Sequence, residues 1–316
     1  MEIKCNYIPV FVFYAWLSKQ FGILLPFTRF KRIVNQIAYE AADYGGDGFS
    51  DIYGDRLFKQ RFYNTLPLWK LNIPLIVLPQ TIGPFSSKRY YDFAIRVLRH
   101  AKYVFVRDAK FEKELKQLDI KYEQAKDLSA YMKPQPFSIE IKPNAIGINV
   151  SGLAYSNRFV GLENQFDAYP ELIDALICYF RDKGNDIYLI PHSYCYASPE
   201  PNNDDLVACR EAYSHLKDKS NVVVVDKDMI APEVKYVISK MKFFIGTRMH
   251  ANFAAIYTGV PLFGLAYSYK FVGAFNANGL DGEKQTSIIN NISPDQIQTI
   301  VQKVANFYSE VFNVNP

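Results

Sequence analysis

The sequence is poor in the residues that build metal sites and disulfide frameworks. It has four cysteines and four histidines in 316 residues. The cysteines include no C-x-x-C pair, and no short metal-ligand cluster joins them to the histidines; they are Cys5, Cys178, Cys195 and Cys209. We therefore expect no metal ion, no structural zinc and a reduced, cytoplasmic setting.

The sequence also lacks a dominant sign of charge. Its 36 Lys and Arg residues against 32 Asp and Glu leave a net charge of +4, without a long run of like charges. A dedicated nucleic-acid binder is usually more basic. We therefore expect no nucleic-acid partner.

Near its N-terminus the sequence has no hydrophobic run long enough to cross a membrane. The apolar run at residues 8–17 is too short for this and lacks a small-residue cleavage site. It favours a buried helix. The alternative is a peripheral membrane patch, in which Trp16 and Phe21 meet lipid beside the basic residues at positions 29, 31 and 32.

The signature motifs of several enzyme classes are missing as well. No expected strand is followed by G-x-G-x-x-G, and the sequence has no Walker loop, no G-x-S-x-G elbow and no H-E-x-x-H. These absences exclude dinucleotide-dependent dehydrogenases, P-loop proteins and serine hydrolases.

What the sequence does contain is an alternation of short apolar runs with amphipathic segments. "PLIVLP", "SSKRYYDFAIRVLRHA" and "YVFVRD" predict a strand, a helix and a strand. A second series runs from "AIGINVSG" through "DIYLIPHS", "NVVVVD" and "KFFIG" to "VPLFGLAY", with helices between the strands. This pattern predicts an α/β fold with parallel sheets covered on both faces. Aromatic residues make up 16% of the chain, and we expect most of them in the core.

Length and a proline-rich segment together predict two domains. A chain of 316 residues with 49% hydrophobic content should form about two of them. The segment "MKPQPFSIEIKPN", at 132–144, is typical of a linker. We therefore predict a first domain at 1–138, a second at 139–290, and a last helix within 291–316 that packs back on the first domain.

The turn "GTRMH" draws attention because ligands of parallel sheets bind where strands end. Gly246 is expected to turn the chain off its strand, and the next helix then offers unpaired N–H groups. Arg248 adds donors matched to a carboxylate or phosphate, and His250 can exchange a proton near neutral pH. The turn predicts a small anionic substrate. The alternative is that Arg248 pairs with a helix-terminal carboxylate and His250 caps the helix.

Other strand ends carry further candidates, each with a structural alternative. "PHS" places His192 at the end of a neighbouring strand, either facing the same cleft or held as a structural hydrogen-bonded group. In "YGGDGFSD", Asp47 and Asp51 are placed either to hold sugar hydroxyls or to cap the next helix. In "VRD", Asp108 is expected to be an N-cap, and Arg107 either starts the helix or contacts a ligand.

Six motifs in chain order resemble the polysaccharide pyruvyl transferase family: "GGDGFSDIYG", "PQTIGPF", "VFVRD", "GINVSG", "IPHS" and "GTRMHANFAAIYTGVP". The resemblance covers roughly residues 36–275, and the last motif is the most specific. It implies two Rossmann-like domains in a GT-B-like arrangement, and we expect the first to be shortened because only 44 residues precede Gly45. It also implies transfer of the enolpyruvyl group of phosphoenolpyruvate onto sugar hydroxyls to form a pyruvate ketal, without a further cofactor.

The resemblance also implies roles for individual residues. The Arg-x-His element of the family falls on Arg248 and His250, which are expected to contact phosphoenolpyruvate. His250 is the candidate acid that protonates the donor, and His192 the candidate base. The further donor-side candidates are Gly246, Ser151 and Arg158. The candidates on the acceptor side are Asp47, Gly46, Gln80 and Arg107.

Two other functions fit the same architecture. A GT-B nucleotide-sugar glycosyltransferase usually has an acidic residue for the ribose in its last strand-to-helix turns, and "GLAYSYKFVGAF" offers none. A non-catalytic glycan-binding protein is favoured by the short N-terminal part. The resemblance implies a sugar acceptor, which in this family is expected to be part of a polysaccharide or lipid-linked oligosaccharide, and a place in the cytoplasm or at the inner membrane face.

Overall fold

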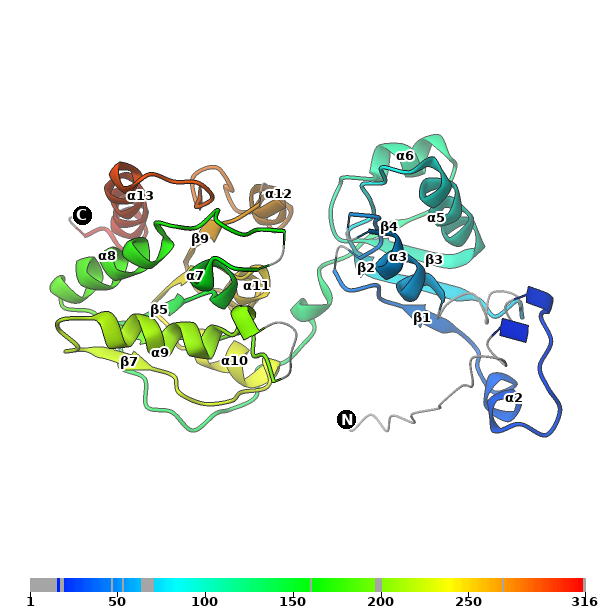
Figure 1. The fold of residues 1–316 in the computed structure, drawn as a ribbon, viewed down its shortest axis with the longest axis horizontal. Helices are drawn as coiled ribbons and strands as arrows, with labels where there is room; N and C mark the ends of the chain where they lie inside the picture. Colours follow the sequence, from blue (N-terminus) through cyan, green and yellow to red (C-terminus); the bar gives the residue numbers. More distant parts are fainter. Residues whose placement is uncertain are drawn as a thin grey trace. The chain divides into compact units, whose positions relative to one another are not determined.

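The computed structural model describes residues 16–17, 20–46, 48–52, 54–63, 71–159, 161–196, 201–268 and 270–314. The chain divides into two compact units, Met1–Leu128 and Ser129–Pro316 (Figure 1). Each unit contains one parallel sheet, so the predicted α/β class is confirmed. The predicted linker at 132–144 belongs to the second unit. The predicted domain limits at 138/139 and 290/291 stay predictions.

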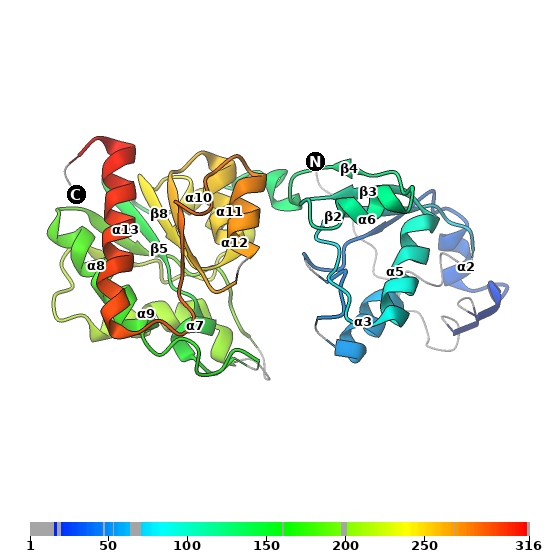
Figure 2. The ribbon, with the colours of Figure 1, turned by 90° about the horizontal axis from the view of Figure 1, so that it is seen from above.

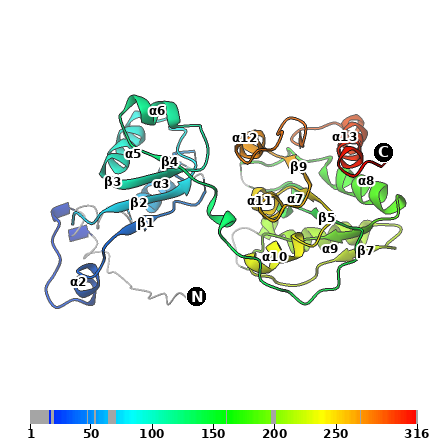
Figure 3. The same cartoon turned by 180° about the vertical axis from the view of Figure 1, so that it is seen from behind.

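The first unit is built on a sheet of four strands in the order β1-β2-β3-β4. Figure 3 shows β1, β2 and β3 side by side. Buried apolar residues at Leu75 and Val77 anchor the central strand. The elements are α2 (Arg29–Val34), β1 (Glu40–Ala42), α3 (Gly54–Tyr63), β2 (Leu75–Gln80), α5 (Lys88–His100), β3 (Ala101–Val106), α6 (Glu112–Gln117) and β4 (Glu123–Gln124).

Aromatic side chains form much of the core of the first unit. The rings of Tyr44 and Phe62 stack with their centroids 4.4 Å apart, and Phe49 and Phe58 pack against the same ring. All four residues are buried. Such ring pairs contribute beyond the area that they bury, and the expected core role of the aromatic residues is confirmed here.

The second unit is built on a sheet of six strands in the order β10-β9-β8-β5-β6-β7. From β5 the chain builds outward to β7 on one side, returns to β8 beside β5, and then builds outward to β10 on the other side. The elements are β5 (Ala145–Asn149), α7 (Gly152–Ser156), α8 (Tyr169–Asp182), β6 (Asp186–Leu189), α9 (Asp205–His215), β7 (Val222–Val224), α10 (Ala231–Ile238), β8 (Phe243–Gly246), α11 (Met249–Thr258), β9 (Leu262–Ala266), α12 (Lys270–Ala277), β10 (Thr286–Ile288) and α13 (Pro294–Phe312).

Helices cover both faces of this second sheet. Figure 2 shows α8 and α13 on one side and α10, α11 and α12 on the other. Successive strand residues point to opposite faces, so Phe243 and Ile245 join the core under α8 and α13, whereas Phe244 joins the core under α10 to α12. All three are fully buried, which explains why the central strands are apolar without alternation.

The last helix has its place in the second unit. Its residues Ile297, Ile300 and Val304 are buried in the core that α8 shares. The apolar face of α13 is therefore used within this unit, and its expected contact with the first domain stays a prediction.

The structure describes only part of the N-terminal segment for which a membrane patch was predicted. Residues 8–15 of the apolar run lie outside the described residues. Trp16 and Phe21 are both exposed and pack edge to face, with ring centroids 5.7 Å apart. Within the described ranges, no helix combines the length and the apolar character needed to cross a membrane. Peripheral membrane contact stays a prediction.

Candidate functional site

The strand order of the second unit marks where a ligand is expected. Between β5 and β8 the direction of strand addition reverses, and open parallel sheets bind ligands at the carboxyl ends of the strands at such a point. The turn after β5 carries Ser151, and the turn after β8 carries Arg248 and His250. The fold therefore brings three of the predicted donor-side residues to the switch point.

A buried carboxylate, Asp205, joins the strand ends at this point. It is the first residue of α9 and has no solvent exposure. Its two oxygens accept hydrogen bonds from the turns after three strands. The donors are the Gly152 backbone N–H at 2.8 Å, the His192 and Ser193 backbone N–H groups at 3.2 and 3.1 Å, Asn149 Nδ2 at 3.2 Å, and the Arg248 guanidinium.

Arg248 is paired with this carboxylate. Its Nε lies 3.0 Å and its Nη2 2.7 Å from Asp205 Oδ1, and Nη2 also donates to both oxygens of Asn203. The Arg248 side chain is 12% exposed. Burial lowers the pKa of the guanidinium, but Asp205 outweighs this effect and holds the pKa above its usual value. The structural alternative, in which Arg248 pairs with a helix-terminal carboxylate, is therefore what the structure shows.

The pairing leaves part of Arg248 for a ligand. Nη1 makes no hydrogen bond to any part of the chain that the structure describes. The Arg248 backbone N–H donates to Asn149 Oδ1 at 2.8 Å, which fixes the start of α11 to the end of β5. Arg248 is the N-cap of α11, and its side chain does not cap the helix. The helix start thus retains the partial positive charge that attracts anions.

The two candidate histidines lie close enough to influence each other. The pKa of His192 is lowered to about 4, chiefly by burial; Asp205 raises it, whereas His250 and Arg248 lower it. His250 is the second residue of α11, is exposed, and meets the Phe253 ring edge to face at 5.8 Å. The cap of this helix is Arg248, so the alternative that His250 caps it is wrong.

Gly246 serves a different purpose from the predicted turn. It is the last residue of β8, and a Cβ atom there would lie 2.2 Å from Asn252 Oδ1. Asn252 is fully buried, and its Nδ2 donates to the carbonyls of Gly246 and Arg248. The glycine is therefore needed because an asparagine packs directly over the strand end.

The remaining donor-side candidates differ in exposure. Ser151 is fully buried, its backbone N–H donates to Tyr169 Oη at 3.0 Å, and its hydroxyl has no hydrogen-bond partner among the described residues. Arg158 lies exposed in the loop after α7. Both follow β5, but only Ser151 lies at the strand end itself.

On the first unit, two of the acceptor-side candidates lie together. The guanidinium nitrogens of Arg107 are 3.6 Å from where a Cβ of Gly46 would be, and Gly46 has a positive φ of 68°. Arg107 also donates to Thr81 Oγ1 at 3.1 Å and pairs with Asp127 at 2.6 Å. Asp47 lies outside the described residues.

The contacts of Gln80 and Asp51 give both residues structural roles. Gln80 is fully buried, and its amide binds Tyr44 N, Ala42 O and Leu78 O. Asp51 accepts hydrogen bonds from Ser86 and from the Ser87 backbone N–H, just before α5. Burial raises the pKa of Asp51, but these hydrogen bonds outweigh burial and lower it. The described hydrogen bonds of the Asp51 carboxylate go to the segment before α5, whose N-cap is Ser87, rather than to the next helix, α3, which Asp51 was predicted to cap. Sugar binding by Asp51 stays a prediction.

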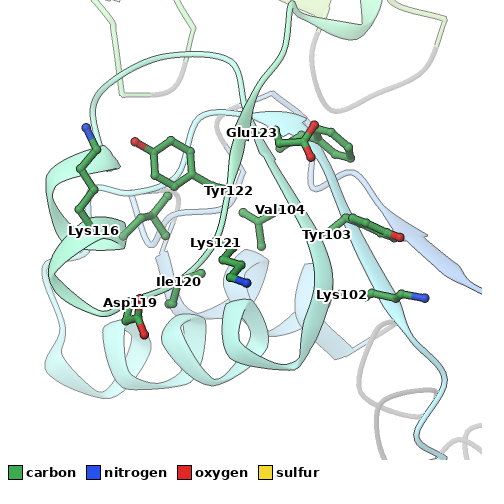
Figure 4. Close-up of a pocket in the computed structure, with 11 residues that line it drawn as sticks. Lys102, Tyr103, Val104, Lys116, Asp119, Ile120, Lys121, Tyr122 and Glu123 are labelled. Atoms are coloured by element: carbon green, nitrogen blue, oxygen red, sulfur yellow. The ribbon is translucent and has the colours of Figure 1, made fainter.

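A separate pocket lies on the first unit, and none of these candidates lines it. It has a volume of about 620 Å³ and is lined by β3, α6 and the segment before β4 (Figure 4). Lys102, Tyr103, Lys121 and Glu123 line it, and no predicted site residue does. The pocket is therefore not the candidate site.

Sequence reasoning missed Asp205, the residue that joins the site. The sequence pattern predicts only a helix between the strands "DIYLIPHS" and "NVVVVD", and the run "DDLVA" begins it. One acidic residue suffices to cap a helix, and Asp204 does so by accepting from the N–H groups of Leu206 and Val207. The second carboxylate of this run, which the helix cap does not need, is the sequence signal that could have pointed to Asp205. Among the described residues, no group of three or more His, Cys, Asp or Glu side chains is arranged to hold a metal.

Comparison with known proteins assigns the family. The model of the family described as polysaccharide pyruvyl transferase matches residues 4–269. The chain belongs to this family. A curated relative, the amylovoran biosynthesis protein AmsJ of Erwinia amylovora, is 20% identical over 283 residues. The match covers 84% of this chain and 65% of AmsJ. The chain therefore spans just under two thirds of the length of this relative.

A solved structure agrees with the fold. The UDP-GlcNAc 2-epimerase from Methanocaldococcus jannaschii matches with a TM-score of 0.51 at 9% identity, over 78% of this chain and 66% of the epimerase. A likeness at this identity concerns the fold alone. The fold class predicted for this family member, α/β with two Rossmann-like units of the GT-B kind, is confirmed.

Proposed function

We propose that this chain transfers the enolpyruvyl group of phosphoenolpyruvate onto hydroxyls of a sugar and so forms a pyruvate ketal. The observation that carries the proposal is the meeting of Arg248, His250 and His192 at the switch point of the second sheet. Family membership supports pyruvyl transfer to a polysaccharide in general. The donor and the ketal product are part of the proposal.

The donor site is proposed at the start of α11. Phosphoenolpyruvate carries a carboxylate and a phosphate, and Arg248 Nη1 together with the helix N-terminus offers matching donors. Asp205 offsets much of the charge of Arg248, so a second cation is needed. Arg158, in the exposed loop after α7, is our candidate, and the hydroxyl of Ser151 would add a hydrogen bond.

The reaction needs both a proton donor and a proton acceptor. C3 of the enol takes a proton while a sugar hydroxyl adds to C2 and gives up its own proton. A second hydroxyl then attacks C2 and gives its proton to the base formed when the acid donated to C3. The C2–O bond to phosphate breaks, and phosphate leaves with the proton taken from the first hydroxyl. We assign the acid to His250 and the base to His192. The lowered pKa of His192 argues against it as the acid, because its ring is neutral at neutral pH and cannot donate the first proton.

The acceptor is proposed to contact the first unit at Gly46 and Arg107. A glycine lets a sugar approach the backbone closely, and Arg107 presents donors beside it. Asp47 would add a carboxylate for sugar hydroxyls. We further propose that the acceptor is part of a polysaccharide or a lipid-linked oligosaccharide, handled in the cytoplasm at the inner membrane face.

The experiment measures phosphate release from phosphoenolpyruvate with a panel of lipid-linked galactosyl, glucosyl and N-acetylmannosaminyl acceptors. We expect release to require an acceptor and to fall about 100-fold or more in Arg248→Ala and in His250→Ala. Matched controls are Arg210→Ala and His215→Ala. Arg210 has an exposed ion pair with Asp226, and His215 lies at the exposed end of α9. Equal losses in variants and controls would contradict the assigned site.

If no acceptor in the panel gives phosphate release, binding of phosphoenolpyruvate is measured by calorimetry. Binding that is lost in Arg248→Ala would support the donor site and indicate that the acceptor lies outside the panel. Binding of sugar without binding of phosphoenolpyruvate would contradict the proposal and indicate a glycan-binding protein.

A further inference from the structure

The surroundings of Asp205 pose an electrostatic question. The carboxylate is fully buried directly behind the arginine proposed to bind an anion. On charge alone, a nearby carboxylate weakens anion binding. A buried charge also costs free energy unless it is paired and hydrogen-bonded. We therefore expect Asp205 to make a contribution to the site that offsets these two costs.

The geometry of the pair suggests this role. Asp205 and Asn203 together occupy Nε and Nη2 of Arg248, which fixes the plane of the guanidinium and leaves Nη1 as its remaining nitrogen. The same carboxylate holds the backbone N–H groups of His192 and Ser193. One side chain thus sets the position of both the arginine and the turn that carries the second histidine.

We propose that Asp205 is a positioning residue of the donor site, which aims Arg248 Nη1 and holds the His192 turn. The inference rests on the proposed function and adds a residue that does not itself touch the donor. Two opposed effects decide whether loss of the Asp205 charge strengthens or weakens binding of the anionic donor. Removing the negative charge of Asp205 strengthens anion binding by electrostatics. Freeing Arg248 and the His192 turn weakens anion binding. We expect the second effect to dominate, because a flexible guanidinium must be ordered again on binding.

The neighbouring Asp204 is a matched control. It also begins α9, but it accepts from the N–H groups of Leu206, Val207 and Cys195 and does not contact Arg248. Asp204→Asn therefore removes a carboxylate charge from the same helix start without releasing the arginine. A difference between the two variants reports positioning rather than loss of stability.

The test compares Asp205→Asn with Asp204→Asn by calorimetric titration of phosphoenolpyruvate. We expect Asp205→Asn to weaken binding about tenfold or more, and Asp204→Asn to change it less than about threefold. In an Arg248→Lys background, Asp205→Asn should have a smaller effect, because only its hold on the His192 turn is then lost. Equal weakening in both variants, or tighter binding in Asp205→Asn, would overturn the inference.

A second variant and a second readout cover the remaining outcomes. If Asp205→Asn does not fold, Asn203→Ala removes the side-chain hydrogen bond of Asn203 to Arg248 and leaves Asp205 in place. We expect this variant to bind phosphoenolpyruvate more weakly, and unchanged binding would overturn the inference.

If the unchanged protein does not bind phosphoenolpyruvate, the proposed function fails. The positioning of Arg248 is then judged by the NMR signal of its Nε–H: loss in Asp205→Asn but not in Asp204→Asn supports it, and equal behaviour overturns it.

Discussion

The two histidines at the switch point have different surroundings, and this bears on which of them can hold a proton. His192 follows β6, its backbone is bound to Asp205, and burial lowers its pKa to about 4. His250 lies exposed in the first turn of α11. At neutral pH the His192 ring is neutral, so it can accept a proton but does not carry one to supply to the donor.

We predict that His192 titrates near pH 4 in the free protein and that phosphoenolpyruvate raises its pKa by about one unit or more, because a nearby anion favours the charged ring. Arg248→Gln should also raise the pKa, whereas Asp205→Asn should lower it, since these two charges act in opposite directions. Histidine NMR titrations check this, with His192→Gln to assign the signal. A pKa at or above 6.5 in the free protein would contradict the structure.

The same pKa shift predicts the direction of a pH effect on stability. Between pH 6.5 and 4, the unfolded His192 binds a proton that the folded residue does not. The free energy of unfolding therefore decreases as the pH falls through this window, by about 3 kcal/mol at most and less because the ring is partly exposed. His192→Gln should flatten this slope in urea unfolding measured across the window.

At the scale of elements, the sequence predicts the strands and their ends well. Apolar runs and helical spacing located β5, β6, β8 and β9, and the turns after them carry the predicted residues. The contacts across those turns were not predictable. Asp205 and Arg248 are 43 residues apart in the chain, and their pairing depends on the strand order. Gly246 looked like a turn glycine because the sequence does not show that Asn252 folds back over it.

We predict that Gly246→Ala destabilises the protein by about 1–3 kcal/mol, because the new Cβ would overlap Asn252 Oδ1 and force it away. Asn252 holds the carbonyls of Gly246 and Arg248, so phosphoenolpyruvate binding should weaken as well. Denaturant unfolding and calorimetry measure the two effects.

The control for Gly246→Ala is Gly273→Ala. Gly273 is an exposed residue within α12, and its Cβ would meet no atom within 4 Å. This change should stabilise the protein slightly, by about 0.5–1 kcal/mol, because alanine favours the helix. If Gly246→Ala behaves like Gly273→Ala, Asn252 does not pack over the strand end as described.

At the scale of the whole molecule, a buried lysine holds the chain where the second unit begins. Lys235 of α10 is 2% exposed, and its Nζ donates to the carbonyls of Ser129 and Met132 at 2.7 Å each. Burial lowers the pKa of this amine. The backbone N–H of Gln135 also donates to the carbonyl of Pro232. The segment that follows the first unit is thus fixed to α10 and belongs to the second unit.

We predict that Lys235→Met lowers the unfolding free energy of the second unit by about 2 kcal/mol or more, because it leaves two carbonyls without their donor. The first unit lies outside these contacts, so its transition should not move. Amides near residues 129–135 should exchange faster with solvent. Differential scanning calorimetry and hydrogen exchange with mass spectrometry measure both effects.

Lys240→Met provides the comparison for Lys235→Met. Lys240 follows the same helix, is exposed, and contacts only the face of the Tyr236 ring at 4.9 Å among the interactions described for its amine. Its removal should change stability by less than about 0.5 kcal/mol. Faster exchange near 129–135 in both variants, or a shift of both unfolding transitions in Lys235→Met, would mean that the lysine does not fix this segment to the second unit.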